Sequence, residues 1–496
     1  MTFIANINIP AILIFVVAFL VLAWWLRRPQ QNLPAGPWGW PLLGYLPNLV
    51  ISTYRTGLPL PQLFNSLAKD YGSVCSLNIA GTLVIVLNNF RCVKDGLDNP
   101  DISDRPKLLD GHRKMLDQGE GVGAASGEAW KEQRRFTITA LRGFGVGKRS
   151  FEVNIAEEAE FLAKEISSLN GKAFNPCDYF SNATSNVICA VVFGKRFEYS
   201  DINFKRFMRI INENAQTAGL QHFLPLAKYL RTSGIKTIKR NFESQLAFMK
   251  SIINDHKKDH VQNDPRDYID VYLDEIEQRQ KLNSNSHVNY KNLPATIRVL
   301  FGAGTETTST TLRWAVLYMM AFPEIQDRVH QELDSVVGRN RLPKLADKAD
   351  LPFTCATLFE VQRIASIVPL GVPHTCGKDT TLGPYTIPKG SIVVPNLWAV
   401  HHDPDSWPNP DEFNPERFLD KDGAFRDSGK VIPFAIGRRV CLGEQLAKME
   451  LYIFFTHLLH QFTFKKPDDS PSLSLEGHNG FTNPPKPYLV EFIARD

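Results

Sequence analysis

The chain has 496 residues, of which 43% are hydrophobic and 22% are charged, so its composition is that of a globular protein with a large core. The net charge of +4 is small for this length and the Lys and Arg residues are scattered, which argues against a nucleic-acid-binding protein. Seven cysteines are widely spaced and form no CxxC pair, so neither a disulfide framework nor a cysteine-type zinc site is indicated.

An apolar segment at the start of the chain predicts a single transmembrane helix within residues 1–28. Residues 9–26 carry no charge, and as a helix they reach roughly 27 Å, close to the hydrocarbon thickness of the endoplasmic reticulum bilayer. Trp24 and Trp25 are placed for the membrane interface, and the two arginines that follow put the N-terminus in the lumen and the body in the cytosol. The alternative is a cleaved signal peptide, but a basic leader and a clear cleavage site are missing.

The next segment, residues 29–41, is rich in proline and glycine and cannot continue a helix. We expect it to form a stiff hinge that sets the body against the membrane face. Beyond residue 40 there is no long linker and no repeat, so residues 42–496 are expected to form one large, mostly helical domain.

The proline-free segment between Pro294 and Pro323 predicts one helix of about 40 Å. Its centre, residues 303–307, has the sequence AGTET and combines glycines with a run of threonines, all of which are poor helix formers. One interpretation is a core helix whose threonine hydroxyls donate to backbone carbonyls of the preceding turn.

The strongest motif is FAIGRRVCLG at residues 434–443. Apolar residues recur at helical spacing after it, so a long buried helix is predicted to begin just after Cys441. A thiolate there faces the positive end of the helix dipole and free backbone N–H groups, and both lower the pKa of the thiol. Gly437 permits a tight turn, Gly443 leaves room for a flat cofactor, and Arg439 can pair with a carboxylate on it. The other six cysteines suit the alternative of small buried apolar residues.

These ten residues match every fixed position of F-x-x-G-x-R-x-C-x-G and resemble the haem-binding signature of the cytochrome P450 family. Residues 303–307, 360–363 and 415–418 are similar to the family's oxygen-binding, ExxR and PERF elements, in the expected order. The sequences GVGAASGEAWKEQRRF and PHTCGKD look most like the animal microsomal family 2 enzymes. The resemblance covers nearly the whole chain. It implies a mainly α fold with small β-sheets, shaped as a triangular prism, with the haem between the Ala303 helix and the Cys441 loop.

The resemblance implies a haem-thiolate monooxygenase that binds haem b through Cys441. Such an enzyme inserts one atom of O2 into a small hydrophobic substrate, such as a xenobiotic, a fatty acid or a steroid. It also implies a local distortion of the helix at residues 303–307, where Thr307 and Glu306 would deliver protons to the oxygen, with Glu306 linked to solvent. Two rival functions stay open: a haem-thiolate isomerase or dehydratase that acts on lipid hydroperoxides, and a non-catalytic haem sensor.

Two further sets of residues take their roles from the resemblance. The haem propionates would be bound by Arg105, Trp130, Arg134, His374 and Arg439, although His374 could also be an ordinary surface histidine. Glu360, Arg363 and Arg417 would form a buried structural network behind the haem. His401 and His402 look like a metal-binding pair but are expected in the loop before Pro415, and we assign them no role.

Because no flavin or nicotinamide motif is present, electrons derived from NADPH must come from another protein. The expected donor is NADPH–cytochrome P450 reductase, with cytochrome b5 as a second candidate. Donor surfaces in this system are acidic, so we expect them to meet a basic patch, with solvated surface charge as the alternative; its candidate residues are Lys131, Arg135, Arg142, Arg438 and Lys448.

The substrate pocket is expected to be predominantly apolar. Each of its candidates could equally be ordinary core packing. The candidates are Leu108, Met115, Phe207, Leu300, Phe301, Ala303, Val368, Leu370 and Phe481.

Overall fold

The computed structural model describes residues 10, 14–19, 22, 32–106, 119–217, 233–282, 285–478 and 480–495. Most of the predicted anchor lies outside the described residues, as do Leu108 and Met115. Within the described ranges, no helix combines the length and the apolar character that a membrane span requires.

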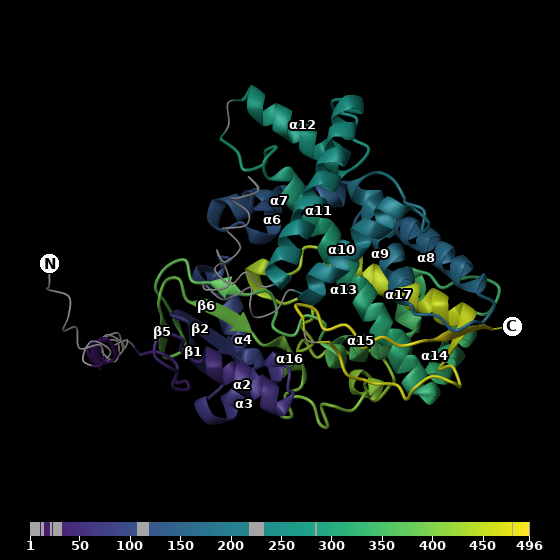
Figure 1. The fold of residues 1–496 in the computed structure, drawn as a ribbon. Helices are drawn as coiled ribbons and strands as arrows, with labels where there is room; N and C mark the ends of the chain where they lie inside the picture. Colours follow the sequence, from purple (N-terminus) through teal and green to yellow (C-terminus); the bar gives the residue numbers. More distant parts are fainter. Residues whose placement is uncertain are drawn as a thin grey trace.

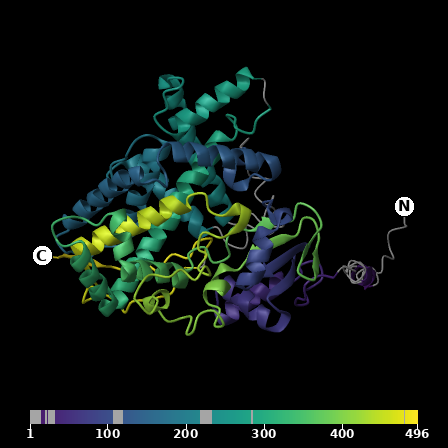
Figure 2. The same ribbon diagram turned by 180° about the vertical axis from the view of Figure 1, so that it is seen from behind.

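Helices make up most of the described fold, as predicted, and Figures 1 and 2 show them gathered into one broad helical body. The α-helices are α2 (Leu46–Thr56), α3 (Leu60–Tyr71), α4 (Phe90–Asp98), α6 (Gly121–Ala124), α7 (Gly127–Gly143), α8 (Glu152–Ser167), α9 (Cys177–Val192), α10 (Ile202–Thr217), α11 (Ser233–Asp259), α12 (Tyr268–Lys281), α13 (Leu293–Ala321), α14 (Pro323–Val336), α15 (Pro352–Ala365), α16 (Leu397–His401) and α17 (Glu444–Gln461). Short 3-10 helices are η1 (Pro100–Ile102), η3 (Arg149–Phe151), η6 (Leu345–Asp350), η7 (Pro415–Phe418) and η8 (Gly437–Arg439).

The strands form small sheets, and the largest lies beside α2, α3 and α4 at one corner of the molecule (Figure 1). The strands are β1 (Val74–Ile79), β2 (Thr82–Leu87), β3 (His374–Thr375), β4 (Thr380–Leu382), β5 (Tyr385–Ile387), β6 (Ile392–Pro395), β7 (Phe462–Lys465) and β8 (Glu491–Ala494). The main sheet has the order β1-β2-β6-β3, in which only the β2–β6 pair is parallel. The pairs β4–β5 and β7–β8 are separate and antiparallel.

The main sheet is covered on both faces because its side chains alternate. Ile85 and Leu87 of β2 face a cluster that includes residues of α4, whereas Val84 and Val86 pack with Phe64 of α3 on the other face. The antiparallel β3–β6 pair then holds His374 at one edge of this sheet.

Helix α13 lies at the centre of the helical body, where it packs against α9, α11, α15 and α17. Pro294 lies in its first turn, where the missing N–H group has no intrahelical partner to lose, and the helix ends just before Pro323. Residues 308–320 are all buried. The predicted helix is therefore confirmed.

The expected distortion at residues 303–307 does not interrupt α13, which is α-helical throughout. The hydroxyl of Thr307 donates to the Ala303 carbonyl at 2.7 Å, and that of Thr311 donates to the Thr307 carbonyl at 2.9 Å. These are the back-bonded hydroxyls of the alternative interpretation, and they satisfy threonine side chains without breaking the helix.

The described part of the predicted hinge runs along strand β1. The Ser76 hydroxyl donates to the Pro34 carbonyl at 2.7 Å, and the Ser76 N–H donates to the Ala35 carbonyl at 2.9 Å. A Cβ atom at Gly36 would lie 1.8 Å from the Ser76 carbonyl oxygen. Residues 34–36 are thus attached to the body, and glycine at position 36 makes that close approach possible.

Glu360 and Arg363 of α15 and Arg417 of η7 form one buried ionic network. Arg363 pairs bidentately with Glu360, at 2.7 and 2.8 Å, and both side chains are fully buried. The Arg417 Nε atom lies 3.2 Å from the same carboxylate. Further N–H groups of Arg363 donate to the carbonyls of His401 and Pro410, so this network attaches the segment leading to residue 417 to α15.

His401 and His402 were expected in a loop, but His401 is the last residue of α16 and His402 caps that helix. The ring of His401 bonds the Ser366 hydroxyl through Nδ1 at 2.7 Å and accepts from the Ile432 N–H through Nε2 at 2.9 Å. Both nitrogens are used, so His401 has no lone pair left for a metal.

We predict that Glu360→Gln lowers the free energy of unfolding by about 3–5 kcal/mol, because it leaves two buried guanidinium groups without their carboxylate. Urea unfolding of the full-length protein measures this. The matched control is Glu476→Gln, which breaks the exposed pair with Lys486 and should cost about 0–1 kcal/mol. Equal losses in the two variants would contradict the prediction.

Candidate functional site

The Cys441 loop is a tight turn that delivers the cysteine to the start of α17. Gly437 has φ +74°, and a Cβ atom there would lie 2.3 Å from the Leu97 carbonyl oxygen of α4. The Cys441 N–H closes the loop by donating to the Phe434 carbonyl at 3.0 Å. The predicted turn at Gly437 and the predicted helix start are confirmed, since α17 begins at Glu444.

The Cys441 thiol differs from the other six cysteines, which are buried or half-buried, because its residue is exposed. Around an added Cβ atom at Gly443, the nearest atom is Cys441 Sγ, at 4.0 Å. Glycine therefore leaves open space beside the sulfur.

The expected lowering of the thiol pKa was wrong for the protein alone. Although the residue is exposed, the protein atoms around its side chain partly desolvate the thiol and raise the pKa of Cys441, while the Gly443 N–H and the charge of Arg134 act to lower it. A metal ion bound to the sulfur would deprotonate this thiol.

On α13, Ala303 and Thr307 lie one turn apart and share a face that the described residues leave partly open. Ala303 is exposed and Thr307 is half-buried, although Thr305, Glu306 and Thr308 are buried. Exposure at the centre of an otherwise buried helix indicates room for a ligand beside these two residues.

Glu306 points away from that face and is buried. Its Oε1 atom accepts hydrogen bonds from Thr310 at 3.2 Å and from Thr482 at 3.1 Å. Burial raises the pKa of Glu306, while Arg313 and the two hydroxyls act to lower it. Thr482 is distant in sequence, and no sequence signal identified it or Arg313 as partners of Glu306.

A group of basic side chains, which we call the basic cluster, consists of Arg105, Arg134, Arg439 and His374, with Trp130 beneath Arg439. The Arg439 guanidinium lies 3.9 Å from the centre of the Trp130 ring. Arg134 donates to the Val440 carbonyl at 2.7 Å, next to Cys441. The structure therefore brings these five predicted residues together beside the Cys441 loop.

The basic cluster carries more positive than negative charge. Burial lowers the pKa of all three guanidinium groups, and mutual repulsion lowers it further for Arg105 (to about 10) and Arg439 (to about 9). Asp104 is the carboxylate that offsets this effect at Arg439. Arg105 Nε is buried without a hydrogen-bond partner among the described residues. Among the described residues, three guanidinium groups with one nearby carboxylate favour the binding of a ligand with two negative charges.

His374 is buried rather than a surface histidine. Burial and the charges of Arg105 and Arg439 lower its pKa to about 3, so its ring is neutral. Its Nδ1 bonds the Ile102 carbonyl at 2.7 Å, and a carbonyl only accepts, so Nδ1 carries the hydrogen. In this form Nε2 is an acceptor, and His374 donates to an anion only after protonation, which a nearby carboxylate favours.

Comparison with known proteins shows which family the chain belongs to. The cytochrome P450 family profile matches residues 34–492. Cytochrome P450 2J2 of Homo sapiens is 40% identical over 487 residues, which cover 97% of this chain and 95% of the relative. Cytochrome P450 2U1 of Homo sapiens is 38% identical over 505 residues, covering 97% and 92%, and cytochrome P450 2J1 of Oryctolagus cuniculus is 39% identical over 497 residues, covering 99% and 97%.

The chain belongs to the cytochrome P450 family. As a member it is a haem-thiolate monooxygenase with haem b as its cofactor, and it inserts one atom of O2 into a small hydrophobic substrate. The predicted likeness to the animal family 2 enzymes is confirmed by relatives of the 2J and 2U groups. The likeness to the 2J and 2U relatives favours the monooxygenase over the rival isomerase and sensor functions.

The residues present fit a haem. Its iron needs an axial ligand, which the exposed Cys441 offers, and its two propionates need cations, which the basic cluster offers. The unpartnered Arg105 Nε and the open faces at Gly443 and Ala303 are further features that such a ligand would complete.

Among the candidates for the basic patch, Arg135, Arg142 and Arg438 are exposed. Lys131 is paired with Glu128, and Lys448 is paired with Glu444, so their charges are partly offset. Two exposed cations were missed by the sequence argument, Lys148 and Arg149. They follow Gly147, where an added Cβ atom would lie 3.2 Å from Gln445 of α17, so they are close to the Cys441 side of the molecule.

The substrate-pocket candidates divide by burial. Phe207, Leu300 and Phe301 are buried, and the ring centres of Phe301 and Phe207 lie 5.0 Å apart in a cluster of phenylalanines. These three residues therefore fit the alternative of ordinary core packing. Ala303 and Phe481 are exposed, whereas Val368 and Leu370 are half-buried, so these four have surface that a substrate could contact.

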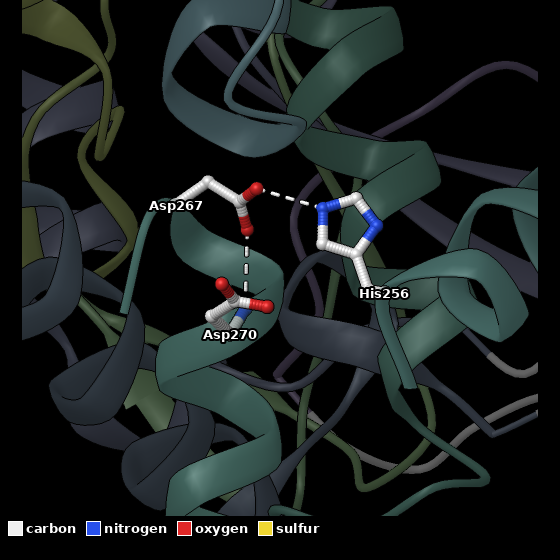
Figure 3. A group of neighbouring side chains, drawn as sticks. All are labelled: His256, Asp267 and Asp270. Carbon is white, nitrogen blue, oxygen red and sulfur yellow. Dashed lines mark hydrogen bonds and ion pairs between the residues drawn. The ribbon is translucent and has the colours of Figure 1, made fainter. Parts of the chain in front are cut away.

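Figure 3 shows His256, Asp267 and Asp270, the group of potential metal ligands found among the described residues outside this site. His256 Nε2 lies 2.7 Å from Asp267, and Asp270 binds Arg266 at 2.6 and 3.1 Å. Asp270 is thus paired with Arg266, and Asp267 is paired with His256 when that ring is protonated. The group is an ion-pair network that joins the end of α11 to the start of α12.

We predict that this network makes stability depend on pH. Burial acts to lower the pKa of His256, but the bonds to Asp267 and Ile252 and the nearby carboxylates outweigh it and raise the pKa. The stabilisation is therefore complete below the unfolded-state pKa of about 6.5 and is lost as the pH rises through the higher folded-state pKa. His256→Gln should remove the loss of unfolding free energy as the pH rises through the pKa of His256. The control His287→Gln, at an exposed histidine, should leave that loss unchanged. An unchanged slope in His256→Gln would refute the prediction.

Proposed function

We propose that Cys441 is the axial thiolate ligand of the haem iron. The motif at residues 434–443, the exposed sulfur at the start of α17 and the open space at Gly443 support this assignment. When bound, the haem supplies the activation of O2, and electron donation from the thiolate favours cleavage of the O–O bond.

The basic cluster is assigned to the two propionates. Arg105, Arg134 and Arg439 are the permanent cations, and Trp130 supports Arg439 through its ring. His374 contributes as an imidazolium, once a propionate offsets the two guanidinium charges that hold its pKa low. The excess of positive charge in the basic cluster is the one observation that carries this assignment.

Thr307 and Glu306 are assigned to proton delivery. Thr307 is on the open face of α13, so its hydroxyl can exchange its bond to the Ala303 carbonyl for one to a ligand. Glu306 is the residue directly before Thr307, and its carboxylate accepts hydrogen bonds from Thr310 and Thr482. Its pKa is raised towards neutral pH, where a carboxyl group can both release and accept a proton. The substrate would lie beside them, against Ala303, Val368, Leu370 and Phe481.

The electrons are proposed to come from NADPH–cytochrome P450 reductase, with cytochrome b5 as a second donor. The exposed cations Arg135, Arg142 and Arg438 lie on the elements that form the basic cluster and the Cys441 loop, so an acidic donor surface would dock beside the thiolate. We further propose that residues 1–28 anchor the chain in the endoplasmic reticulum membrane with the domain at residues 42–496 in the cytosol, because residues 9–26 carry no charge and two arginines follow them.

The axial ligand is tested by the optical spectrum of the reduced, CO-bound protein. The wild type should give the far red-shifted Soret band of thiolate ligation, and Cys441→Ser should lose it. Cys92→Ser, at a half-buried cysteine of α4, should keep the band. A wild type without the shift, or a Cys441→Ser variant that keeps it, would overturn the assignment.

The docking patch is tested by charge reversal at Arg135, Arg142 and Arg438. The rate of reductase-supported turnover at limiting reductase should fall about tenfold, because electrostatic steering is lost, and wild-type turnover should weaken as salt is added. Lys421→Glu reverses an exposed charge in the segment after η7 and should have little effect. Turnover that is insensitive to salt would count against the patch.

A further inference from the structure

A segment close to the C-terminus lies along the part of α13 that follows Glu306. The Thr482 hydroxyl donates to Glu306 Oε1 at 3.1 Å, and the Trp314 ring N–H donates to the Asn483 carbonyl at 2.8 Å. Two neighbouring residues of the segment thus bond α13 at points about two turns apart. The contact at Thr482 ends on a carboxyl, so this segment reaches a group that can carry a proton.

The segment is held in place independently of the Thr482 hydroxyl. The Asn483 N–H donates to the Ile367 carbonyl at 2.8 Å, and the Asn483 side-chain amide donates to the Ala365 carbonyl at 3.0 Å. These bonds attach the residue after Thr482 to the end of α15, in addition to its bond with Trp314. Removal of the hydroxyl alone should therefore leave the backbone of the segment where it is.

Two hydroxyls act on one oxygen of the Glu306 carboxyl. Thr310 donates to Glu306 Oε1 at 3.2 Å, so Oε1 accepts from Thr310 and from Thr482, and all three residues are buried. A carboxylate oxygen has two lone pairs, so these two donors occupy Oε1. Oε2 accepts no hydrogen bond among the described residues. A proton on this carboxyl is therefore favoured on Oε2.

The charges near Glu306 do not replace these two hydroxyls. The titratable groups that act on it among the described residues are Arg313, two turns later on α13, and the Cys177 thiol at the start of α9. Burial raises the pKa of Glu306, while Arg313, Thr482 and Thr310 act to lower it. Arg313 acts through its charge, whereas the two hydroxyls bond the carboxylate directly and so determine its orientation.

We propose that Thr482 is a positioning residue that, together with Thr310, occupies Oε1 of Glu306 and leaves Oε2 as the oxygen that takes and gives the proton. Thr310 is on the same helix as Glu306, whereas Thr482 fixes the carboxyl relative to the rest of the molecule. The inference rests on the proposed role of Glu306 in proton delivery. The alternative is that the Thr482 hydroxyl is satisfied by a nearby acceptor and has no effect on proton transfer.

The experiment compares Thr482→Val and Thr482→Ser with the wild type as full-length holoenzymes with reductase. The readout is product formed per NADPH consumed. Thr482→Val has nearly the same shape but no donor, so product per NADPH should fall about threefold to tenfold, the change expected for one lost hydrogen bond. Thr482→Ser keeps the hydroxyl and should match the wild type. The control Thr357→Val removes a buried hydroxyl of α15, which donates to the Phe353 carbonyl, and should leave product per NADPH unchanged.

A second readout needs no turnover and would not respond to a merely structural role. Loss of a donor destabilises the charged form of a carboxylate, so the pKa of Glu306 should rise in Thr482→Val. Infrared difference spectra of the holoenzyme recorded against pH measure this, with the band of the protonated carboxyl identified by its absence in Glu306→Gln. The midpoint should move up by about one pH unit in Thr482→Val and should stay at the wild-type value in Thr482→Ser.

Two results would overturn the proposal. If Thr482→Val keeps product per NADPH and the infrared midpoint at their wild-type values, the hydroxyl has no influence on Glu306. If Thr482→Ser changes as much as Thr482→Val, the effect comes from repacking of the segment and not from the hydroxyl. Glu306→Gln tests the underlying assignment: wild-type product per NADPH there would reject the role of Glu306 in proton delivery, while the infrared midpoint would still report whether Thr482 acts on its carboxyl.

Discussion

Repulsion among the guanidinium groups of Arg105, Arg134 and Arg439 is the constraint on which the site depends. Burial makes their charges costly, and Asp104, the carboxylate that acts on them among the described residues, offsets them only in part. They come from distant parts of the chain and are held in place by backbone carbonyls, such as those of Ser103, Ala125 and Val440. A dianionic ligand relieves the repulsion and holds those parts together. The group that supplies the chemistry would therefore also stabilise the fold around it.

The same segments determine where the thiol lies. Arg134 donates to the carbonyl just before Cys441, and Arg439 lies two residues before it, so any ligand that satisfies the basic cluster is brought to the sulfur. The network of Glu360, Arg363 and Arg417 is separate from this cluster. It holds the preceding segment to α15, and His401 extends it to the backbone of Ile432, just before the Cys441 loop. The Glu360 network is bonded within the protein, by one carboxylate and by backbone carbonyls, whereas we propose that a ligand completes the basic cluster.

Polar contacts within apolar packing place the groups on α13. Glu306 depends on Thr482, from a segment near the C-terminus that also bonds the end of α15 through Asn483. Further along α13, the Trp314 ring N–H donates to the Asn483 carbonyl of the same segment at 2.8 Å. Polar contacts with the C-terminal segment thus add to the apolar packing of α13.

The sequence by itself determined the local features: the helix between Pro294 and Pro323, the turn at Gly437, the start of α17 after Cys441 and the family to which the motifs belong. These follow from residue types within a few positions of one another, because glycine, proline and helical periodicity act locally. Only the tertiary structure decided which groups compensate one another. It placed Thr482 against Glu306, kept α13 unbroken at residues 303–307, and surrounded the Cys441 thiol with protein atoms whose desolvating effect raises its pKa. Those outcomes depend on desolvation and on contacts between residues far apart in the chain, which no local pattern encodes.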